Sequence, residues 1–162
     1  MNTYELLEDE ACKEGIDIVD YDFKSEKIRG IYCDKTIGLS TEIETKAEKV
    51  CVLAEELGHH YTSSGDILDQ NDISNRKQEL KARLWAYDKM IGLSGIIKGH
   101  HHRCQNRYEL AEYLGVTEEF LQEALNYYSS KYGAYVIFDN YLIRFQPRIA
   151  VVERFENPLG YN

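Results

Sequence analysis

The sequence predicts an α+β fold, because two kinds of hydrophobic periodicity occupy different parts of the chain. Ile16 and Ile18 alternate with acidic residues within residues 16–23, which predicts a half-buried strand. Residues 28–33 and 36–40 are typical of two more short strands joined at Asp34-Lys35, so a small antiparallel sheet is expected. From residue 45 onward, apolar residues recur at three- and four-residue spacing, which predicts helices. A length of 162 residues suits one domain with its own core. We therefore expect a single domain over residues 1–162 with a helical C-terminal half.

A short helix is predicted ahead of the strands, over residues 3–14. Thr3 is placed to cap the N-terminus of this helix, and Gly15 is placed to end it. Residues 1–44 are therefore expected to hold one helix and the small sheet.

Two long amphipathic helices are predicted next. The first runs from Thr45 to about Ser63, and the second runs from about Asn75 to Ile91. A polar loop joins them, so the two helices are expected to lie antiparallel. Residues 45–91 are the part of the chain in which we expect a functional site.

The remaining segments are predicted to be a loop, a helix pair and a hairpin. Residues 92–104 are expected to form loop and turn, and residues 106–133 are typical of a helix-turn-helix. Residues 134–162 are expected to form a C-terminal hairpin, with its turn at Asp139-Asn140, followed by a tail.

The acidic composition limits the classes of partner. The chain has 28 Asp and Glu against 19 Lys and Arg, which gives a formal net charge of −9. Nucleic acids and anionic membranes are repelled by such a charge. Glu118 and Glu119 begin the second helix of the helix-turn-helix-like segment, where they oppose contacts with phosphate. We therefore expect no direct nucleic-acid binding, and a structural or protein-docking role for this segment.

The sequence also predicts a cytoplasmic protein that has no membrane segment. No stretch approaches the roughly 18 consecutive apolar residues of a membrane span, and the N-terminus is acidic where a signal peptide is basic. The four cysteines, Cys12, Cys33, Cys51 and Cys104, form no CxxC pair. We expect them to be reduced thiols buried as small apolar residues.

A metal-binding pattern lies in the first long helix. Residues 55–59 read EELGH and are similar to HExxH, in which two His one turn apart hold zinc and the Glu activates a water. Glu55 stands at the first ligand position, where a carboxylate is also a zinc ligand. Gly58 inside the helix costs about 1 kcal/mol relative to Ala, which indicates close approach by another backbone or a metal. The pattern predicts a metal site at Glu55 and His59, beside Glu56.

A third ligand is expected from the neighbouring helix. Glu79 lies near the start of that helix, and two antiparallel helices would bring it opposite His59. Asp66, Asp69 and Asp72, in the joining loop, are weaker candidates.

These motifs together resemble the ImmA/IrrE family of zincin-like metallopeptidases of phages and mobile elements. The resemblance covers roughly residues 45–128 and rests on EELGH followed by a helix that carries Glu79, Ala82, Trp85 and Ala86. It implies a zincin-like core, zinc as the cofactor with manganese or iron as alternatives, and a phage-type repressor as the protein substrate. It also implies that Glu56 is the general base and that His59 and Glu79 are ligands. The family's first His falls on Glu55, so this chain is an EELGHH variant.

Several residues and functions are left open by the sequence. His60 is an alternative ligand or an oxyanion donor, and Tyr61 is a third choice for the oxyanion. The Glu and His pairs of this helix are also compatible with a solvated surface. The consecutive histidines of residues 100–102 are expected in a solvated loop. The alternative function is a non-catalytic protein that binds a transcriptional regulator on a degenerate zincin scaffold, and an acidic mimic of nucleic acid is weaker still.

Overall fold

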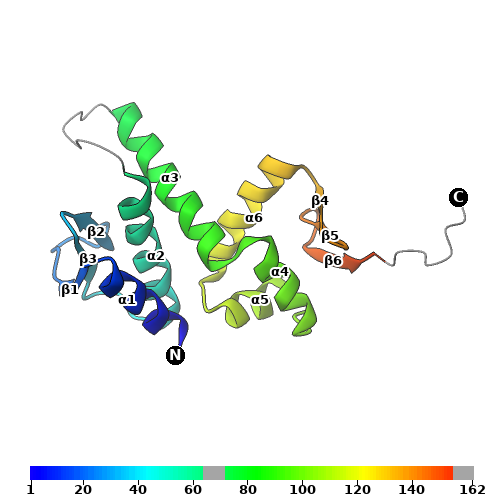
Figure 1. The fold of residues 1–162 in the computed structure, drawn as a ribbon, viewed down its shortest axis with the longest axis horizontal. Coiled ribbons are helices and arrows are strands. Elements are labelled where there is room, and N and C mark those ends of the chain that lie inside the picture. The colour runs from blue at the N-terminus through cyan, green and yellow to red at the C-terminus, as the bar shows by residue number, and fades with distance from the viewer. Residues whose placement is uncertain (64–71, 155–162) are drawn as a thin grey trace, which may run out of the picture. The chain divides into compact units, whose positions relative to one another are not determined.

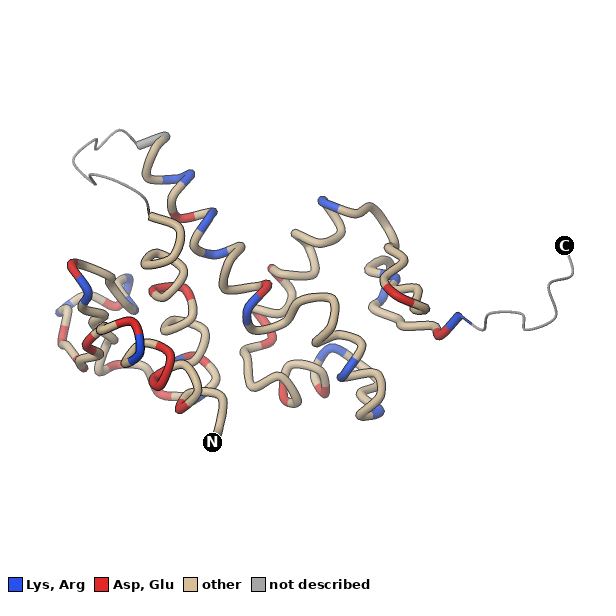
Figure 2. Tube along the Cα trace, in the orientation of Figure 1, with Lys and Arg blue, Asp and Glu red and all other residues tan. Residues whose placement is uncertain are grey.

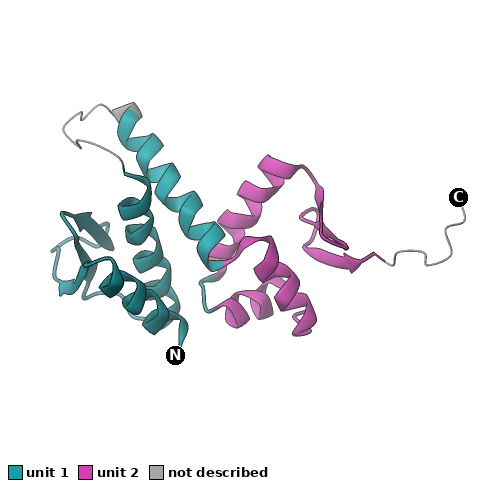
Figure 3. Ribbon diagram, in the orientation of Figure 1, with its two compact units in different colours: residues 1–90, 115–117 teal, residues 91–114, 118–162 magenta. Residues whose placement is uncertain are grey.

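A computed structural model describes residues 1–63 and 72–154, and Figure 1 shows their helices and strands. The chain forms two compact units, coloured separately in Figure 3. The first contains residues 1–90 and 115–117, and the second contains residues 91–114 and the chain from residue 118. Both units combine helices with a three-stranded sheet, so the predicted α+β class is confirmed.

The first helix, α1 (Thr3–Lys13), begins at Thr3 itself, so its N-cap lies one residue before the predicted one. Asn2 is the N-cap, and the backbone N–H of Glu5 donates to its side chain at 3.0 Å. The Glu5 carboxylate in turn accepts from the backbone N–H of Asn2 at 2.8 Å, which completes a capping box. The predicted cap at Thr3 is therefore wrong, whereas Gly15 follows the helix with a φ of +71° as a helix stop requires.

The sheet of the first unit contains β1 (Asp17–Tyr21), β2 (Gly30–Cys33) and β3 (Thr36–Ser40) in the order β1-β3-β2. Strand β2 pairs antiparallel with β3, but β1 pairs parallel with β3. The predicted antiparallel sheet is therefore wrong for β1. Alternation of apolar residues shows which face of a strand is buried, but it does not determine which strand becomes the neighbour. Here β3 takes the centre, where Ile37 and Leu39 are fully buried.

Helices α2 (Lys46–Thr62) and α3 (Asp72–Met90) pack against each other in this unit. Thr45 caps α2, since its hydroxyl accepts from the backbone N–H of Glu48 at 3.1 Å. A Cβ at Gly58 would lie 2.3 Å from the carbonyl oxygen of Ala82. The close approach by another backbone that Gly58 indicated is therefore confirmed, and α3 supplies that backbone.

Opposite charges lie on the helices of the first unit. Figure 2 shows that acidic residues predominate on α1 and α2, whereas basic residues are spread along α3. The Nζ atom of Lys89 lies 2.6 Å from a carboxylate oxygen of Glu10, which joins α3 to α1. Basic residues of α3 therefore pair with acidic residues of both neighbouring helices, Lys89 with Glu10 of α1 and Arg83 with Glu55 of α2.

The second unit begins with a helix that the sequence pattern did not predict. Residues 92–101, predicted as loop and turn, form α4 (Gly92–His101). A Cβ at Gly99 would lie 2.3 Å from Cδ1 of Leu110, so this glycine allows close packing of α4 against α5 (Arg107–Leu114). The glycines that favoured a loop are therefore packing positions inside a helix.

The predicted pair of helices and the C-terminal hairpin are both present in the second unit. After α5, helix α6 (Glu118–Tyr132) leads into an antiparallel sheet. Strands β4 (Tyr135–Phe138) and β5 (Tyr141–Arg144) form the predicted hairpin, and Asp139 in its turn has a φ of +56°. A third strand that was not predicted, β6 (Ala150–Glu153), pairs with β5. None of the helices in the described ranges combines the length and the apolarity of a membrane span.

The cysteines are only partly as expected. All four are free thiols, and Cys51 is buried. Cys12 and Cys33 are exposed, which corrects the expectation that all four are buried. Each of these two lies on the outward face of an amphipathic element, a position that composition alone does not reveal.

Candidate active site

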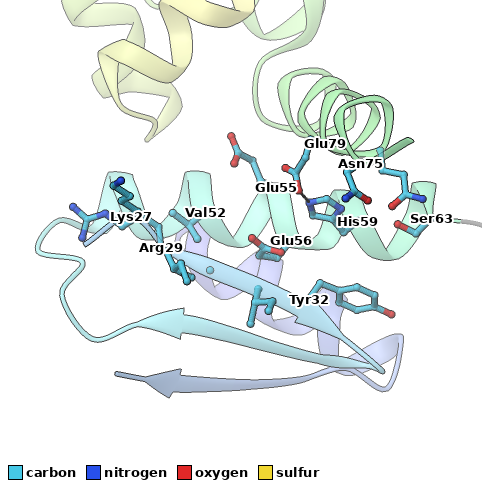
Figure 4. A pocket seen from close by; sticks show the side chains of 14 residues that line it. Lys27, Arg29, Tyr32, Val52, Glu55, Glu56, His59, Ser63, Asn75 and Glu79 are labelled. Carbon is cyan, nitrogen blue, oxygen red and sulfur yellow. Dashed lines mark ion pairs between the residues drawn. The ribbon is translucent and has the colours of Figure 1, made fainter. Parts of the chain in front are cut away.

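A cavity of about 490 Å³ lies in the first unit between β2, α2 and the beginning of α3. Residues 27–32 form its wall on the sheet side, and Figure 4 shows the side chains that enter it from the two helices. Its size is typical of small-ligand and peptide-binding pockets. Four of the residues singled out from the sequence line it, namely Glu55, Glu56, His59 and Glu79.

The structure brings His59 and Glu79 together across the two helices. Nε2 of His59 lies 3.4 Å from Oε1 of Glu79, although the two residues are 20 positions apart in the chain. The contact is drawn as a dashed line in Figure 4. The expectation that Glu79 lies opposite His59 is met, because α2 and α3 run antiparallel at the close distance that Gly58 permits.

Glu56 is the buried acid of this cavity. It is 8% exposed, and no hydrogen bond from a described residue reaches its carboxyl group. Gly30 on β2 makes room for it, since a Cβ there would lie 3.0 Å from Oε1 of Glu56. Burial raises the pKa of the Glu56 carboxyl to about 8, and the negative charges of Glu79 and Glu55 add to this effect. A carboxyl group with a pKa near neutrality is suited to take and return a proton.

Glu55 lines the same cavity but is directed to another partner. Its Oε1 lies 3.8 Å from Nε of Arg83 on α3, and a third of its side chain is exposed. In Figure 4 the Glu55 carboxylate lies apart from the contact between His59 and Glu79. Glu55, the candidate for the first ligand position, therefore forms an ion pair with Arg83.

His60 and Tyr61 point away from the cavity. The hydroxyl of Tyr32 lies 2.8 Å from Nδ1 of His60, whose Nε2 lies 3.1 Å from the Glu14 carboxylate. The hydroxyl of Tyr61 donates to Glu10 at 3.0 Å, and its ring stacks on Trp85. Neither residue lines the cavity, so neither is brought to His59 and Glu79.

Tyr32 is a cavity residue that no sequence motif indicated. It lines the wall beside His59, and it connects β2 to α2 through His60. The sequence holds 13 tyrosines, and nothing in the strand pattern separates Tyr32 from the others. Only the pairing of β2 with β3 turns it toward α2.

The sequence offered further metal-ligand candidates in the loop after α2 and in the consecutive histidines. Asp66 and Asp69 fall outside the described residues, and the side chain of Asp72 is likewise not described. The histidines expected in a loop belong to α4 and its end instead. There, Nε2 of His101 lies 2.7 Å from the hydroxyl of Tyr141.

The donors of the cavity fit zinc in type, and two of them fit it in spacing. Ligand atoms of a tetrahedral zinc, with bonds of about 2.0–2.2 Å, are separated by about 3.3–3.6 Å. The 3.4 Å between Nε2 of His59 and Oε1 of Glu79 lies in this range. Across residues 1–63 and 72–154, no three His, Cys, Asp or Glu side chains converge closely enough to form a complete metal site. The pair therefore provides two ligand positions, and Glu55 is the nearby carboxylate held elsewhere.

Comparison with known proteins finds a family match that includes the residues of the cavity. The family model for the IrrE N-terminal-like domain, Peptidase_M78, matches residues 11–126. The chain belongs to the Peptidase_M78 family. The match extends from α1 to α6 and so contains the whole cavity, and the family is one of generally metal-dependent peptidases. No curated protein and no solved structure matches the chain.

Proposed function

We propose that the protein is a metal-dependent endopeptidase whose active site is the cavity between α2, α3 and β2. The observation that carries this proposal is the contact between His59 and Glu79 beside the buried carboxyl of Glu56. Membership of the Peptidase_M78 family supports it. The ligand set is His59 and Glu79, with Glu55 as the third ligand once its carboxylate leaves Arg83. Zinc is the preferred metal, and manganese and iron are the alternatives.

Under this proposal the metal ligands and Glu56 have separate tasks. His59 and Glu79, together with Glu55, would hold the metal, which would supply polarisation of the scissile carbonyl and a lower pKa of a water molecule. Glu56 takes a proton from the attacking water on a carboxylate oxygen and returns it to the leaving amine. A nearby cation favours the ionised carboxylate, which is the form of Glu56 that accepts a proton. Gly30 has no side chain, so β2 approaches both Val52 and Glu56 closely, and the Glu56 carboxyl group is buried from bulk water.

The first experiment measures metal content and hydrolysis in the same preparations. Wild-type protein purified without an affinity tag is analysed by elemental mass spectrometry, together with His59→Ala, Glu79→Ala and His101→Ala. About one zinc per chain is expected in the wild type and in the control His101→Ala, which lies in the other unit. Loss of zinc is expected in the two cavity variants. Full zinc content in Glu79→Ala would remove Glu79 from the ligand set.

Hydrolysis is then tested with peptides derived from a bacterial proteome, using mass spectrometry to detect new termini. Zinc-loaded wild type is expected to cut the peptides, and Glu56→Gln is expected to keep its zinc while losing about 10²–10⁴-fold in rate. Equal rates in both proteins would show that Glu56 is not the base. Wild type that binds no zinc even after incubation with the metal, and that cuts no peptide, would contradict the peptidase function. That outcome would favour the alternative function of a non-catalytic binding protein.

A phage-type repressor is our proposed substrate, and it needs a separate test. Wild type and Glu56→Gln are expressed in cells that carry a prophage, and new protein termini are compared between the two. We expect a new terminus in a helix-turn-helix repressor with the wild type alone. New termini confined to other proteins would overturn this substrate while leaving the peptidase activity intact.

A further inference from the structure

The cavity has opposite charges at its two ends. Figure 4 shows Lys27 and Arg29 at one end, whereas His59 and Glu79 lie at the other. Among the described residues that line the cavity, Lys27 and Arg29 are the only lysine and arginine. A ligand that extends along the cavity therefore meets a basic region at a distance from the proposed catalytic centre.

Lys27 provides the uncompensated charge of the basic end. Nε of Arg29 lies 3.2 Å from Oε1 of Glu48 on α2, so this arginine already has an acidic partner. Lys27 has no acidic partner within residues 1–63 and 72–154. Its side chain is exposed and lines the cavity, so its ammonium group is available to a ligand.

The geometry of α2 gives the spacing between the two ends. Arg29 lies beside Glu48, which is 11 positions before His59 in the same helix. At a rise of 1.5 Å per residue, this separation is about 16 Å along the helix axis. An extended peptide rises about 3.3 Å per residue, so about five of its residues span that distance.

Strand β2 offers a backbone edge along the same path. It pairs with β3 on one side, and no strand of the described residues pairs with it on the other. Gly30, Ile31 and Tyr32 of this strand line the cavity. An open edge of this kind binds extended peptides through backbone hydrogen bonds.

We propose that the cavity selects an extended peptide that carries Asp or Glu about five residues from the bond beside His59 and Glu79, with Lys27 as the specificity-determining residue. The acidic side chain meets the ammonium group of Lys27, while the peptide backbone follows β2 toward the catalytic end. The position of the bond rests on the proposed peptidase function. The preference for an acidic residue does not depend on it.

The preference is tested by peptide binding to metal-free protein. Wild type, Lys27→Glu and Lys81→Glu are immobilised in the presence of EDTA and exposed to a mixture of randomised dodecapeptides. Bound peptides are eluted with high salt and sequenced by mass spectrometry. Lys81 is an exposed lysine of α3 that does not line the cavity, so its variant carries the same change in net charge.

We expect Asp and Glu to be enriched several-fold in peptides bound by wild type and by Lys81→Glu. Lys27→Glu is expected to lose this enrichment and to favour Lys and Arg instead. The same selection by Lys27→Glu as by wild type would overturn the proposal, and so would the absence of acidic enrichment in wild type. Circular dichroism of all three proteins shows whether each is folded.

The spacing is tested by hydrolysis of proteome-derived peptides with zinc-loaded wild type. An acidic residue is expected four to six positions from the cut bond, and Lys27→Glu is expected to remove this preference. Enrichment of acidic peptides in the binding assay without any cleavage would contradict the peptidase function but support the preference for an acidic residue. Cleavage with no acidic residue at that distance would leave the peptidase function and overturn this inference.

Discussion

Burial distinguishes Glu56 from the other acidic residues of its helix. Glu55, one position earlier, is partly exposed and pairs with Arg83, whereas Glu56 is buried without a hydrogen-bonding partner among the described residues. An unpartnered carboxyl group is destabilising in its charged form, which is why its pKa is raised to about 8. A buried carboxyl group of this kind does not stabilise the folded protein. Its place in a cavity beside His59 therefore favours a chemical role for Glu56.

The raised pKa of Glu56 predicts a pH-dependent stability of the metal-free protein. Between pH 4.5 and 8 the folded protein keeps a proton that the unfolded chain has lost, so the free energy of unfolding falls as the pH rises through this window. Glu56→Gln removes this dependence. Urea unfolding in EDTA should show the variant more stable than wild type by a few kcal/mol at pH 9, with a smaller difference at pH 5. A difference that does not change with pH would contradict the prediction.

The cysteines provide an independent test of burial at the scale of one residue. Burial raises the pKa of the Cys51 thiol to about 11, whereas Cys12 and Cys33 are exposed. We expect iodoacetamide to alkylate Cys12 and Cys33 in the native protein while Cys51 stays unmodified until the protein is unfolded. Peptide mass spectrometry at increasing times measures this order. Equal rates for Cys51 and Cys12 would show that the N-terminus of α2 is open to solvent.

At the scale of elements, the contact between α2 and α3 controls the site. Gly58 allows the two helices to approach until its Cα faces the carbonyl of Ala82, and His59 follows it directly in the sequence. A larger separation of the helices would lengthen the distance from His59 to Glu79. Gly58 therefore has a positioning role in addition to its role in packing.

The role of Gly58 predicts a large effect of a single methyl group. Gly58→Ala places a Cβ 2.3 Å from the Ala82 oxygen, so we expect a loss of about 1–3 kcal/mol in unfolding free energy and a loss of metal affinity. Gly95→Ala in α4 is the matched control, because its Cβ would lie 3.4 Å from Leu114. The control should keep or raise stability by up to about 1 kcal/mol. Comparable destabilisation in both variants would show that helix contact at Gly58 is not limiting.

At the scale of the whole molecule, the proposed ligands join helices that the sequence separates. His59 lies on α2 and Glu79 on α3, so a metal held by both would connect these two helices of the first unit. A ligand that binds only the folded state raises its stability by mass action. The metal is therefore expected to act as a structural link as well as a cofactor.

Zinc should raise the thermal midpoint of the wild type. At a free zinc concentration about 100-fold above the dissociation constant, the stabilisation is about 2.7 kcal/mol, which corresponds to a rise of several degrees. His59→Ala and Glu79→Ala should show no rise, and His101→Ala should behave as the wild type. Differential scanning calorimetry with and without EDTA measures the midpoints. An equal rise in His59→Ala would place the zinc elsewhere.

The sequence predicted most elements correctly but not how the first sheet is assembled. Helices α2 and α3, the pair formed by α5 and α6, and the β4–β5 hairpin follow from local periodicity and turn residues. Helix α4 was missed because Gly92, Gly95 and Gly99 favour a loop locally, whereas packing against α5 favours a helix. The single-domain organisation stays a prediction, and the described residues form two compact units.

The sequence by itself determined the α+β class, the family resemblance and the candidate residues Glu55, Glu56, His59 and Glu79. These depend on residue type and on spacing within single helices and strands, where the local geometry fixes which side chains share a face. Only the tertiary structure decided that Glu79 meets His59, that Arg83 holds Glu55 and that Glu56 is buried beneath Gly30. Side-chain partners and burial depend on elements distant in the chain, and no local pattern encodes which of these elements will pack together.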